Sequence, residues 1–243
     1  MTDLRGRVAL VTGGSRGIGR AIAVSLAEAG AGVAVNYREK AADAEAVAQT
    51  IRGRGGKALA VCADVSQASD VARMMAEVER ALGPVDVLVN NAGVGLVRSV
   101  DDLTEADFDL TIAVNLKSVF LCTQAAVPGM RARKWGRIVN ISSGAARGAG
   151  GVGPHYNASK AGMEGMTRGY AARLVKDGIT VNAVAPSLIE TDMVKQGMPG
   201  AASRIPLGRF GTPEECAQVV MMLVGNGYMT GQTVALSGGL SFL

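Results

Sequence analysis

A tyrosine and a lysine four positions apart, Tyr156 and Lys160, are the two residues whose types and spacing most clearly could do chemistry. In a helix over residues 156–176 their side chains would lie on one face, one turn apart. An ammonium group beside a phenol favours the phenolate, and so lowers a tyrosine pKa that is ordinarily near ~10. Such a tyrosine can act as an acid or base near neutral pH. A surface tyrosine packed on a lysine stem has the same spacing, so the rest of the chain must decide.

Short apolar runs alternate with longer helical patterns along the chain, and these elements would position the pair. Strands are predicted over residues 8–12, 33–36, 58–62, 85–90, 137–142, 179–185 and 233–236. Helices are predicted over 17–30, 41–52, 66–83, 104–133, 156–176 and 213–223, with Ser66 and Thr104 as N-caps and an irregularity near Pro128. Strands that are regularly followed by helices predict an α/β fold. We expect a single domain, 1–243, with a Rossmann-type, doubly wound parallel sheet of seven strands flanked by helices. The irregular segment 186–210 is the expected substrate loop.

The composition narrows the class of protein. The 243 residues include 48% hydrophobic side chains, 33 glycines and only 4% aromatics, which is typical of aliphatic buried strands joined by tight turns. Basic and acidic side chains number 25 and 21, so a nucleic-acid partner is not expected. A small basic cluster is typical of a solvated helix end, although it could also receive an anionic substrate carrier. This cluster consists of Arg131, Arg133, Lys134 and Arg137.

The cysteines and the apolar stretches bear on the compartment. Cys62, Cys122 and Cys216 are odd in number and far apart, and they form neither a metal-ligand pattern nor a disulfide framework. A reducing compartment is therefore expected. Residues 1–5 show no signal peptide, and no stretch approaches ~18 uninterrupted apolar residues. We expect a cytoplasmic protein with neither a bound metal nor a membrane span.

A glycine-rich turn follows the first predicted strand. Gly13, Gly17 and Gly19 have the spacing G-x-x-x-G-x-G, which is looser than the six-residue dinucleotide fingerprint. Glycines serve the same purposes in both spacings. They allow a tight turn, a close approach of backbone to pyrophosphate, and a helix N-terminus that faces the phosphates. Its place in a strand–helix–strand unit favours a dinucleotide site over an ordinary turn.

The end of the second predicted strand indicates which dinucleotide is bound. It reads Val35-Asn36-Tyr37-Arg38, without the carboxylate that would hydrogen-bond a ribose 2′-hydroxyl or repel a 2′-phosphate. Arg38 can pair with that phosphate, and Arg16 in the glycine turn is a second cation nearby. The pattern favours NADP(H) over NAD.

With both sites in view, the chain resembles the short-chain dehydrogenase/reductase family over essentially its full length. The matching motifs occur in order, and together they are far more specific than any one of them. They are the glycine turn at 12–19, Asp64-Val65 after the third strand, Asn90-Asn91-Ala92-Gly93 after the fourth, Asn115 in the long helix, Ser143 after the fifth strand, and Tyr156 with Lys160.

The resemblance implies a role for each member of a catalytic tetrad. Tyr156 would be the general acid in carbonyl reduction, and Lys160 would lower its pKa and hold the nicotinamide ribose. Ser143, rather than its neighbour Ser142, would bond and orient the substrate carbonyl. Asn115 would kink its helix and hold a water that replenishes the proton on Tyr156 through Lys160.

The resemblance also implies a set of cofactor contacts. One departure is Ser187, since the family commonly has glycine after the equivalent of Pro186, and a second is the short loop at 193–205, which would leave a more open substrate site. The implied contacts are Gly13, Ser15, Arg16, Gly17, Ile18, Gly19, Asn36, Tyr37, Arg38, Asp64, Val65, Asn91, Ala92, Gly93, Tyr156, Lys160, Pro186, Ile189 and Thr191.

Within the family, the segments 185–193, 228–233 and 238–240 are most similar to 3-oxoacyl-acyl-carrier-protein reductases. This likeness implies an NADPH-dependent reduction of a 3-oxoacyl thioester carried by acyl carrier protein. Against it, Asp177 stands where such reductases often place a basic docking residue. The alternatives are reduction of acyl-CoA thioesters, small ketones or sugars, and a non-catalytic nucleotide-binding regulator, which the complete tetrad disfavours.

The resemblance further implies a homotetramer. The long helix that contains Asn115 and the helix after Tyr156 would pair across one interface. The last strand and the helix after Pro213 would pair across another.

Overall fold

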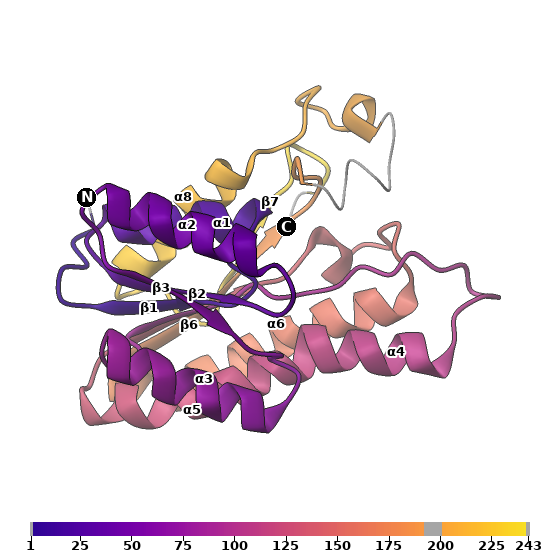
Figure 1. Cartoon of the computed structure of the whole chain (residues 1–243). Helices are drawn as coiled ribbons and strands as arrows, with labels where there is room; N and C mark the ends of the chain where they lie inside the picture. Colours follow the sequence, from indigo (N-terminus) through magenta and orange to yellow (C-terminus); the bar gives the residue numbers. More distant parts are fainter. Residues whose placement is uncertain (1, 192–200, 242–243) are drawn as a thin grey trace.

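Seven parallel strands form one sheet in the computed structural model, which describes residues 2–191 and 201–241 (Figure 1). The strand order is β3-β2-β1-β4-β5-β6-β7, so the direction of winding reverses between β1 and β4. The prediction of a seven-stranded, doubly wound parallel sheet is confirmed. In such sheets ligands bind at the carboxyl ends of the strands beside the reversal point. The strands are β1 (Val8–Val11), β2 (Gly32–Tyr37), β3 (Ala58–Cys62), β4 (Val87–Asn90), β5 (Gly136–Ile141), β6 (Ile179–Pro186) and β7 (Thr233–Leu236).

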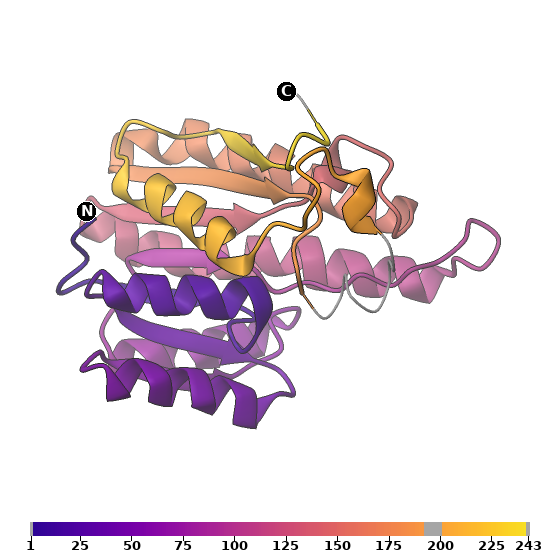
Figure 2. The same cartoon turned by 90° about the horizontal axis from the view of Figure 1, so that it is seen from above.

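Helices cover both faces of the sheet, which explains why the central strands are apolar on both sides (Figure 1). On one face lie α1 (Gly17–Glu28), α2 (Ala41–Gly53) and α8 (Pro213–Gly225). On the other lie α3 (Ala68–Ala81), α5 (Ser118–Ala132) and α6 (Pro154–Leu174). The segment between β4 and α4 (Glu105–Ile112) extends beyond the sheet at the edge where the strands end (Figure 2).

The long helix predicted over 104–133 is interrupted around Asn115, where the resemblance implied a kink, and not near Pro128. Thr104 caps α4 through a capping box with Asp107, as predicted. A π-helical segment, η1 (Ala113–Lys117), then joins α4 to α5, while Pro128 lies inside α5. The irregularity predicted near Pro128 is therefore wrong, and the distortion falls around Asn115. π-helical turns inside helices are frequent at functional sites.

Smaller boundary differences follow from local hydrogen bonds. Ser66 was the predicted N-cap of α3, yet the cap residue is Gln67. Both the amide and the hydroxyl of Ser66 donate instead to Asp64 Oδ1, at 2.9 and 2.7 Å. The helix predicted over 156–176 begins at Pro154, and its last turn is the 3₁₀ segment η3 (Val175–Asp177). Two further 3₁₀ segments are η2 (Gly144–Ala146) and η4 (Ala201–Arg204).

Part of the expected substrate loop, 192–200, lies outside the described residues, and so do most of the positions in the short loop at 193–205. The combined helix Glu105–Ala132 is long and apolar enough to cross a membrane by length and mean hydropathy, although Asn115, Lys117 and Gln124 interrupt its apolar residues. Half of its most apolar window is buried inside the protein. Cys62, Cys122 and Cys216 are free thiols, as predicted.

Candidate active site

The turn between β1 and α1 is crowded in a way that only glycine allows. Gly13 has a φ of +60°, and a Cβ there would lie 3.0 Å from the Cα of Ala92. A Cβ on Gly19 would lie 2.5 Å from Nδ2 of Asn91 and closer still to the carbonyl oxygen of Gly13. Real Cβ contacts are essentially never this short, so the turn can pack against the end of β4 only without side chains.

Hydrogen bonds hold this turn against the residues after β4. The Thr12 hydroxyl oxygen accepts from the amides of Asn91 and Ala92, at 2.9 and 3.0 Å. Asn91 Nδ2 donates to the carbonyl oxygens of Thr12 and Gly13, at 2.9 and 3.0 Å. The two strands beside the reversal point are thus joined at their carboxyl ends, and the motifs 12–19 and 90–93 form one structure.

The residues at the N-terminus of α1 fit a dinucleotide pyrophosphate. In α1, which the structure describes throughout, the first turn has no acidic side chain and no side chain caps the N-terminus. Its backbone N–H groups can therefore be offered to an anion, and the helix dipole favours negative charge there. The side chain of Thr191 lies against this turn, since a Cβ on Gly17 would be 3.3 Å from its Cγ2.

Asn36, an expected cofactor contact, uses its side chain within the protein. It is buried, its Oδ1 accepts from the Gly13 amide at 3.2 Å, and its Nδ2 donates to the Ala63 carbonyl oxygen at 3.1 Å. Asn36 therefore joins β2 to the glycine turn and to the end of β3. Tyr37 follows it at the end of β2 and is half-buried.

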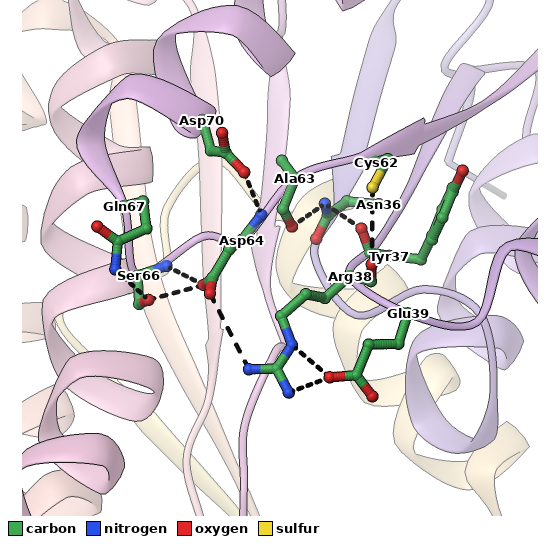
Figure 3. A network of polar contacts seen from close by, with 10 residues as sticks. All are labelled: Asn36, Tyr37, Arg38, Glu39, Cys62, Ala63, Asp64, Ser66, Gln67 and Asp70. Carbon is green, nitrogen blue, oxygen red and sulfur yellow. Dashed lines mark hydrogen bonds and ion pairs between the residues drawn. The ribbon is translucent and has the colours of Figure 1, made fainter.

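Arg38 lies at the end of β2 as predicted, but two carboxylates face it (Figure 3). Its Nε and Nη2 donate to Glu39 Oε1 at 3.0 and 2.5 Å, and its Nη1 lies 4.0 Å from Asp64 Oδ2. The inference that no carboxylate stands at this position is therefore wrong. Asp64 is brought there because β2 pairs with β3 in parallel, with Tyr37 opposite Cys62. The adjacent Val65 is buried.

Tyr156 and Lys160 share one face of α6, as their spacing predicts. Lys160 Nζ lies 5.7 Å from the centroid of the Tyr156 ring. It also donates to the Ile141 carbonyl oxygen, at 2.8 Å, which fixes the buried ammonium at the end of β5. The side chain of Ser143, two residues further on, hydrogen-bonds Tyr156.

Burial controls the protonation of this pair. It raises the pKa of Tyr156, and the hydrogen bond with Ser143 offsets only part of that rise. Burial also lowers the pKa of Lys160 to about 8. The expectation that Lys160 lowers the tyrosine pKa is not met in this structure, because desolvation outweighs the other influences on the phenol. Tyr156 therefore holds its proton more tightly than a free tyrosine does.

Asn115 is the fourth member of the group that the structure brings together. Its Oδ1 accepts from the Val94 amide at 2.8 Å, and its Nδ2 donates to the Val94 carbonyl oxygen at 3.0 Å and to Ser159 Oγ at 3.2 Å. A Cβ on Gly93 would lie 3.3 Å from Asn115 Oδ1 and 3.7 Å from Lys160 Nζ. The π-helical segment, the end of β4 and α6 therefore meet at this glycine.

Sequence reasoning missed two further polar side chains at the site. Glu164 is buried on α6, where it accepts from Ser142 Oγ at 3.3 Å and pairs with Arg147 Nε at 2.9 Å. Asn157 Nδ2 donates to carbonyl oxygens of residues 145, 148 and 149, at 2.9, 2.7 and 2.8 Å. Both fasten the loop that carries Ser143 to the helix that carries Tyr156. The only sequence signal was the helical spacing of these residues from Lys160.

The segment after β6 joins the same edge. Pro186 is the last, buried residue of β6, and Ile189 is buried and forms a β-bridge with Gly211. Ser187 replaces the usual glycine without breaking the pairing, because its amide donates to the Leu236 carbonyl oxygen at 2.9 Å. A Cβ on Gly144 would lie 2.6 Å from Ser187 Oγ, so this hydroxyl lies close to the loop of Ser143.

We expect Gly19→Ala to weaken the binding of a nicotinamide dinucleotide at least ~10-fold and to lower the free energy of unfolding by about 1–3 kcal/mol, because the new methyl group overpacks the turn. Fluorescence titration with NADPH and urea denaturation measure the two effects. Gly53→Ala is the matched control, since a Cβ there meets nothing within 4 Å. Binding in Gly19→Ala within twofold of wild type would contradict the assignment of this turn.

Comparison with known proteins agrees with this geometry. Residues 7–200 match the family model of the short chain dehydrogenases. The chain is 43% identical to a 3-oxoacyl-acyl-carrier-protein reductase of Staphylococcus aureus, with 96% of this chain and 97% of that protein covered. It is 42% identical to a hydroxy(phenyl)methyl-succinyl-CoA dehydrogenase subunit of Thauera aromatica, with 98% of each covered.

A solved structure described as a putative gluconate dehydrogenase of Agrobacterium tumefaciens superposes with a TM-score of 0.93 at 35% identity, covering 100% of this chain and 99% of that one. The motifs, the sheet and these relatives lead to one conclusion: the chain belongs to the short-chain dehydrogenase family and is an oxidoreductase that acts on CH–OH or C=O groups.

Proposed function

We propose that this oxidoreductase is an NADPH-dependent carbonyl reductase whose substrate is a 3-oxoacyl thioester on acyl carrier protein, reduced to the 3-hydroxyacyl form. The observation that carries the reaction type is the meeting of Ser143, Tyr156 and Lys160 beside the glycine turn. The relative of Staphylococcus aureus, a 3-oxoacyl-acyl-carrier-protein reductase, supports the substrate.

In this proposal the chain's own residues orient the carbonyl group and deliver a proton. Ser143 would donate to the substrate carbonyl oxygen and hold it beside Tyr156, whose phenol would donate the proton as that oxygen gains charge. The raised pKa of Tyr156 suits a general acid, because the proton stays in place until it is needed. Bound NADPH would supply the hydride. Lys160 would hold the nicotinamide ribose, and Asn115 would support the route by which the proton is replaced.

NADP(H) is proposed as the cofactor because two arginines stand where a 2′-phosphate would lie. Arg38 is half exposed at the end of β2, and Arg16 is exposed in the glycine turn. We expect Arg38→Asp to shift the ratio of kcat/KM for NADPH over NADH at least ~10-fold toward NADH, since a cation is replaced by an anion. Steady-state assays with both cofactors measure this ratio. Arg54→Asp is the control, as Arg54 is similarly exposed and ion-paired. A wild type that prefers NADH tenfold would refute the choice.

A second substrate class has support of its own. Arg131 and Lys134, which could receive an acidic carrier protein, both pair with Asp177, at 2.7 and 3.6 Å. Arg133 is bound to Asp86 at 3.0 Å. These carboxylates reduce the positive potential of the cluster. A Thauera aromatica relative acts on a CoA thioester. Reduction of acyl-CoA thioesters is therefore the alternative, ahead of small ketones and sugars.

Side-by-side assays separate these substrates. We expect kcat/KM for acetoacetyl-carrier-protein to exceed that for acetoacetyl-CoA, and both to exceed that for small ketones and for sugars with a free carbonyl group. A higher kcat/KM for acetoacetyl-CoA would mean that the substrate is a CoA thioester and would refute the carrier-protein assignment. Turnover of small ketones or sugars alone would overturn the thioester proposal altogether.

We further propose a cytoplasmic homotetramer in which each chain is one domain and residues 186–210 form the substrate loop. Phe108, Leu110 and Phe120 are exposed apolar side chains on α4 and α5. A groove beside them is lined by residues of η1, α5 and α6, including Leu116, Met166 and Tyr170. Pairing of these helices with another copy would cover this face. A monomer in sedimentation measurements would contradict the tetramer.

A further inference from the structure

The side chain of Glu39 engages Arg38, the residue proposed to read the 2′-phosphate (Figure 3). Two of the guanidinium nitrogens of Arg38, Nε and Nη2, donate to Oε1 of Glu39 at 3.0 and 2.5 Å. Its third nitrogen, Nη1, lies 4.0 Å from Asp64 Oδ2. All of the hydrogen-bonding nitrogens of this guanidinium therefore face carboxylate oxygens.

A 2′-phosphate needs the same donors. Arginine binds phosphate through a fork of parallel N–H groups, and the Nε and Nη2 pair of Arg38 is already used by Glu39. A phosphate monoester near neutral pH carries a charge of about −1.5 to −2, so it competes with the Glu39 carboxylate for the Arg38 donors. The ribose 2′-hydroxyl of NADH is neutral and requires neither donor.

Glu39 differs from Asp64 in its freedom to move. Asp64 Oδ1 accepts from both the amide and the hydroxyl of Ser66, at 2.9 and 2.7 Å, and is thereby held in place. The Glu39 side chain is 68% exposed and pairs with the half-exposed Arg38 at the surface. Exposed pairs of this kind are weak, so a phosphate can displace Glu39, although at a cost in affinity.

We propose that Glu39 is a specificity-determining residue, which acts as the counter-ion of Arg38 and so restrains the preference of the enzyme for NADPH over NADH. This inference rests on the proposed function, in that Arg38 must bind the 2′-phosphate. The preference for NADPH over NADH would then be smaller than Arg38 would give in the absence of Glu39.

The test is Glu39→Gln, which removes the charge and keeps the size of the side chain. Dissociation constants for NADPH and NADH are measured by fluorescence titration of the reduced nicotinamide without a carbonyl substrate, and kcat/KM is measured with both cofactors. We expect NADPH to bind about fivefold more tightly, as the loss of one exposed ion pair with Arg38 allows. The NADH constant should stay within twofold. An unchanged NADPH constant would overturn the proposal.

Two controls separate the possible explanations. Glu28→Gln removes the same charge from a similarly exposed pair, with Arg54, and should change neither constant. Helix α2 begins just after Arg38 and ends just before Arg54. The Arg38–Glu39 pair and the Arg54–Glu28 pair are therefore about 20 Å apart along this helix. If Glu28→Gln tightened NADPH binding as much, the tighter binding would come from the net charge of the protein, and the proposed role of Glu39 would be refuted.

Arg38→Ala, alone and combined with Glu39→Gln, tests whether Glu39 acts through Arg38. In the Arg38→Ala background, Glu39→Gln should gain less than twofold. A full fivefold gain there would mean direct repulsion of the phosphate, which contradicts the counter-ion role. If Arg38→Ala alone leaves NADPH binding unchanged, the proposed NADPH site fails. If Arg38→Ala weakens NADPH binding but Glu39→Gln has no effect, only the present inference fails.

Discussion

Tyr156→Phe is expected to lower turnover at least ~100-fold, in line with the loss of a general acid, while NADPH binding stays nearly intact. The substitution removes only the phenolic oxygen, and the ring can keep its place beside the Lys160 ammonium. The hydroxyl is the group that hydrogen-bonds Ser143 and that burial keeps protonated. Ser143 would still donate a hydrogen bond to the substrate oxygen, but a serine hydroxyl is a far weaker acid than a phenol and does not replace Tyr156 as the proton donor.

Single-turnover and steady-state rates of carbonyl reduction, with NADPH titration alongside, check this prediction. Tyr228→Phe is the matched control, because it removes the same oxygen from a tyrosine whose side chain is exposed. That variant should turn over within twofold of wild type. Near-normal turnover in Tyr156→Phe would refute the catalytic assignment.

The sheet and the glycine turn could be predicted because their signals are local. Apolar runs of four to eight residues bounded by glycine predict buried strands, and all seven expected strands lie within two residues of their observed bounds. The candidate tetrad came from the family resemblance, which rests on the order of the motifs along the chain. The carboxyl ends of parallel strands meet at one edge, so Ser143 and Asn91 had to lie near one another.

What could not be predicted depends on contacts between distant segments. The resemblance implied a kink at Asn115, and the helix is distorted at 113–117. No local pattern reveals that Asn115 bonds the backbone of Val94 there, and Pro128 does not interrupt the helix. Asp64 reaches Arg38 only through the register of β2 with β3. The direction of the Tyr156 pKa shift likewise depends on burial, which helical spacing does not report.

Lys160→Met is the second variant with a large expected effect. The buried ammonium is fixed by a 2.8 Å hydrogen bond to the Ile141 carbonyl oxygen, beside the Tyr156 ring. Its loss should lower turnover at pH 7 by at least ~100-fold, a cost similar to that of losing the acid itself. Lys57→Met removes a charge from an exposed position and should keep turnover within twofold.

The same variant tests the protonation of Lys160 independently of catalysis. Burial lowers its pKa in the folded protein from 10.5 to about 8. Between these two values the unfolded chain binds a proton that the folded protein does not, so the stability of wild type relative to Lys160→Met should rise with pH. The expected slope is about 1.4 kcal/mol per pH unit from roughly pH 8 to pH 10, with no such rise below pH 8. Urea denaturation of both proteins at several pH values gives this difference. A difference that stays constant from pH 7 to pH 10 would mean that the folded protein does not depress the lysine pKa, and Lys160 would then be a permanent cation at the site.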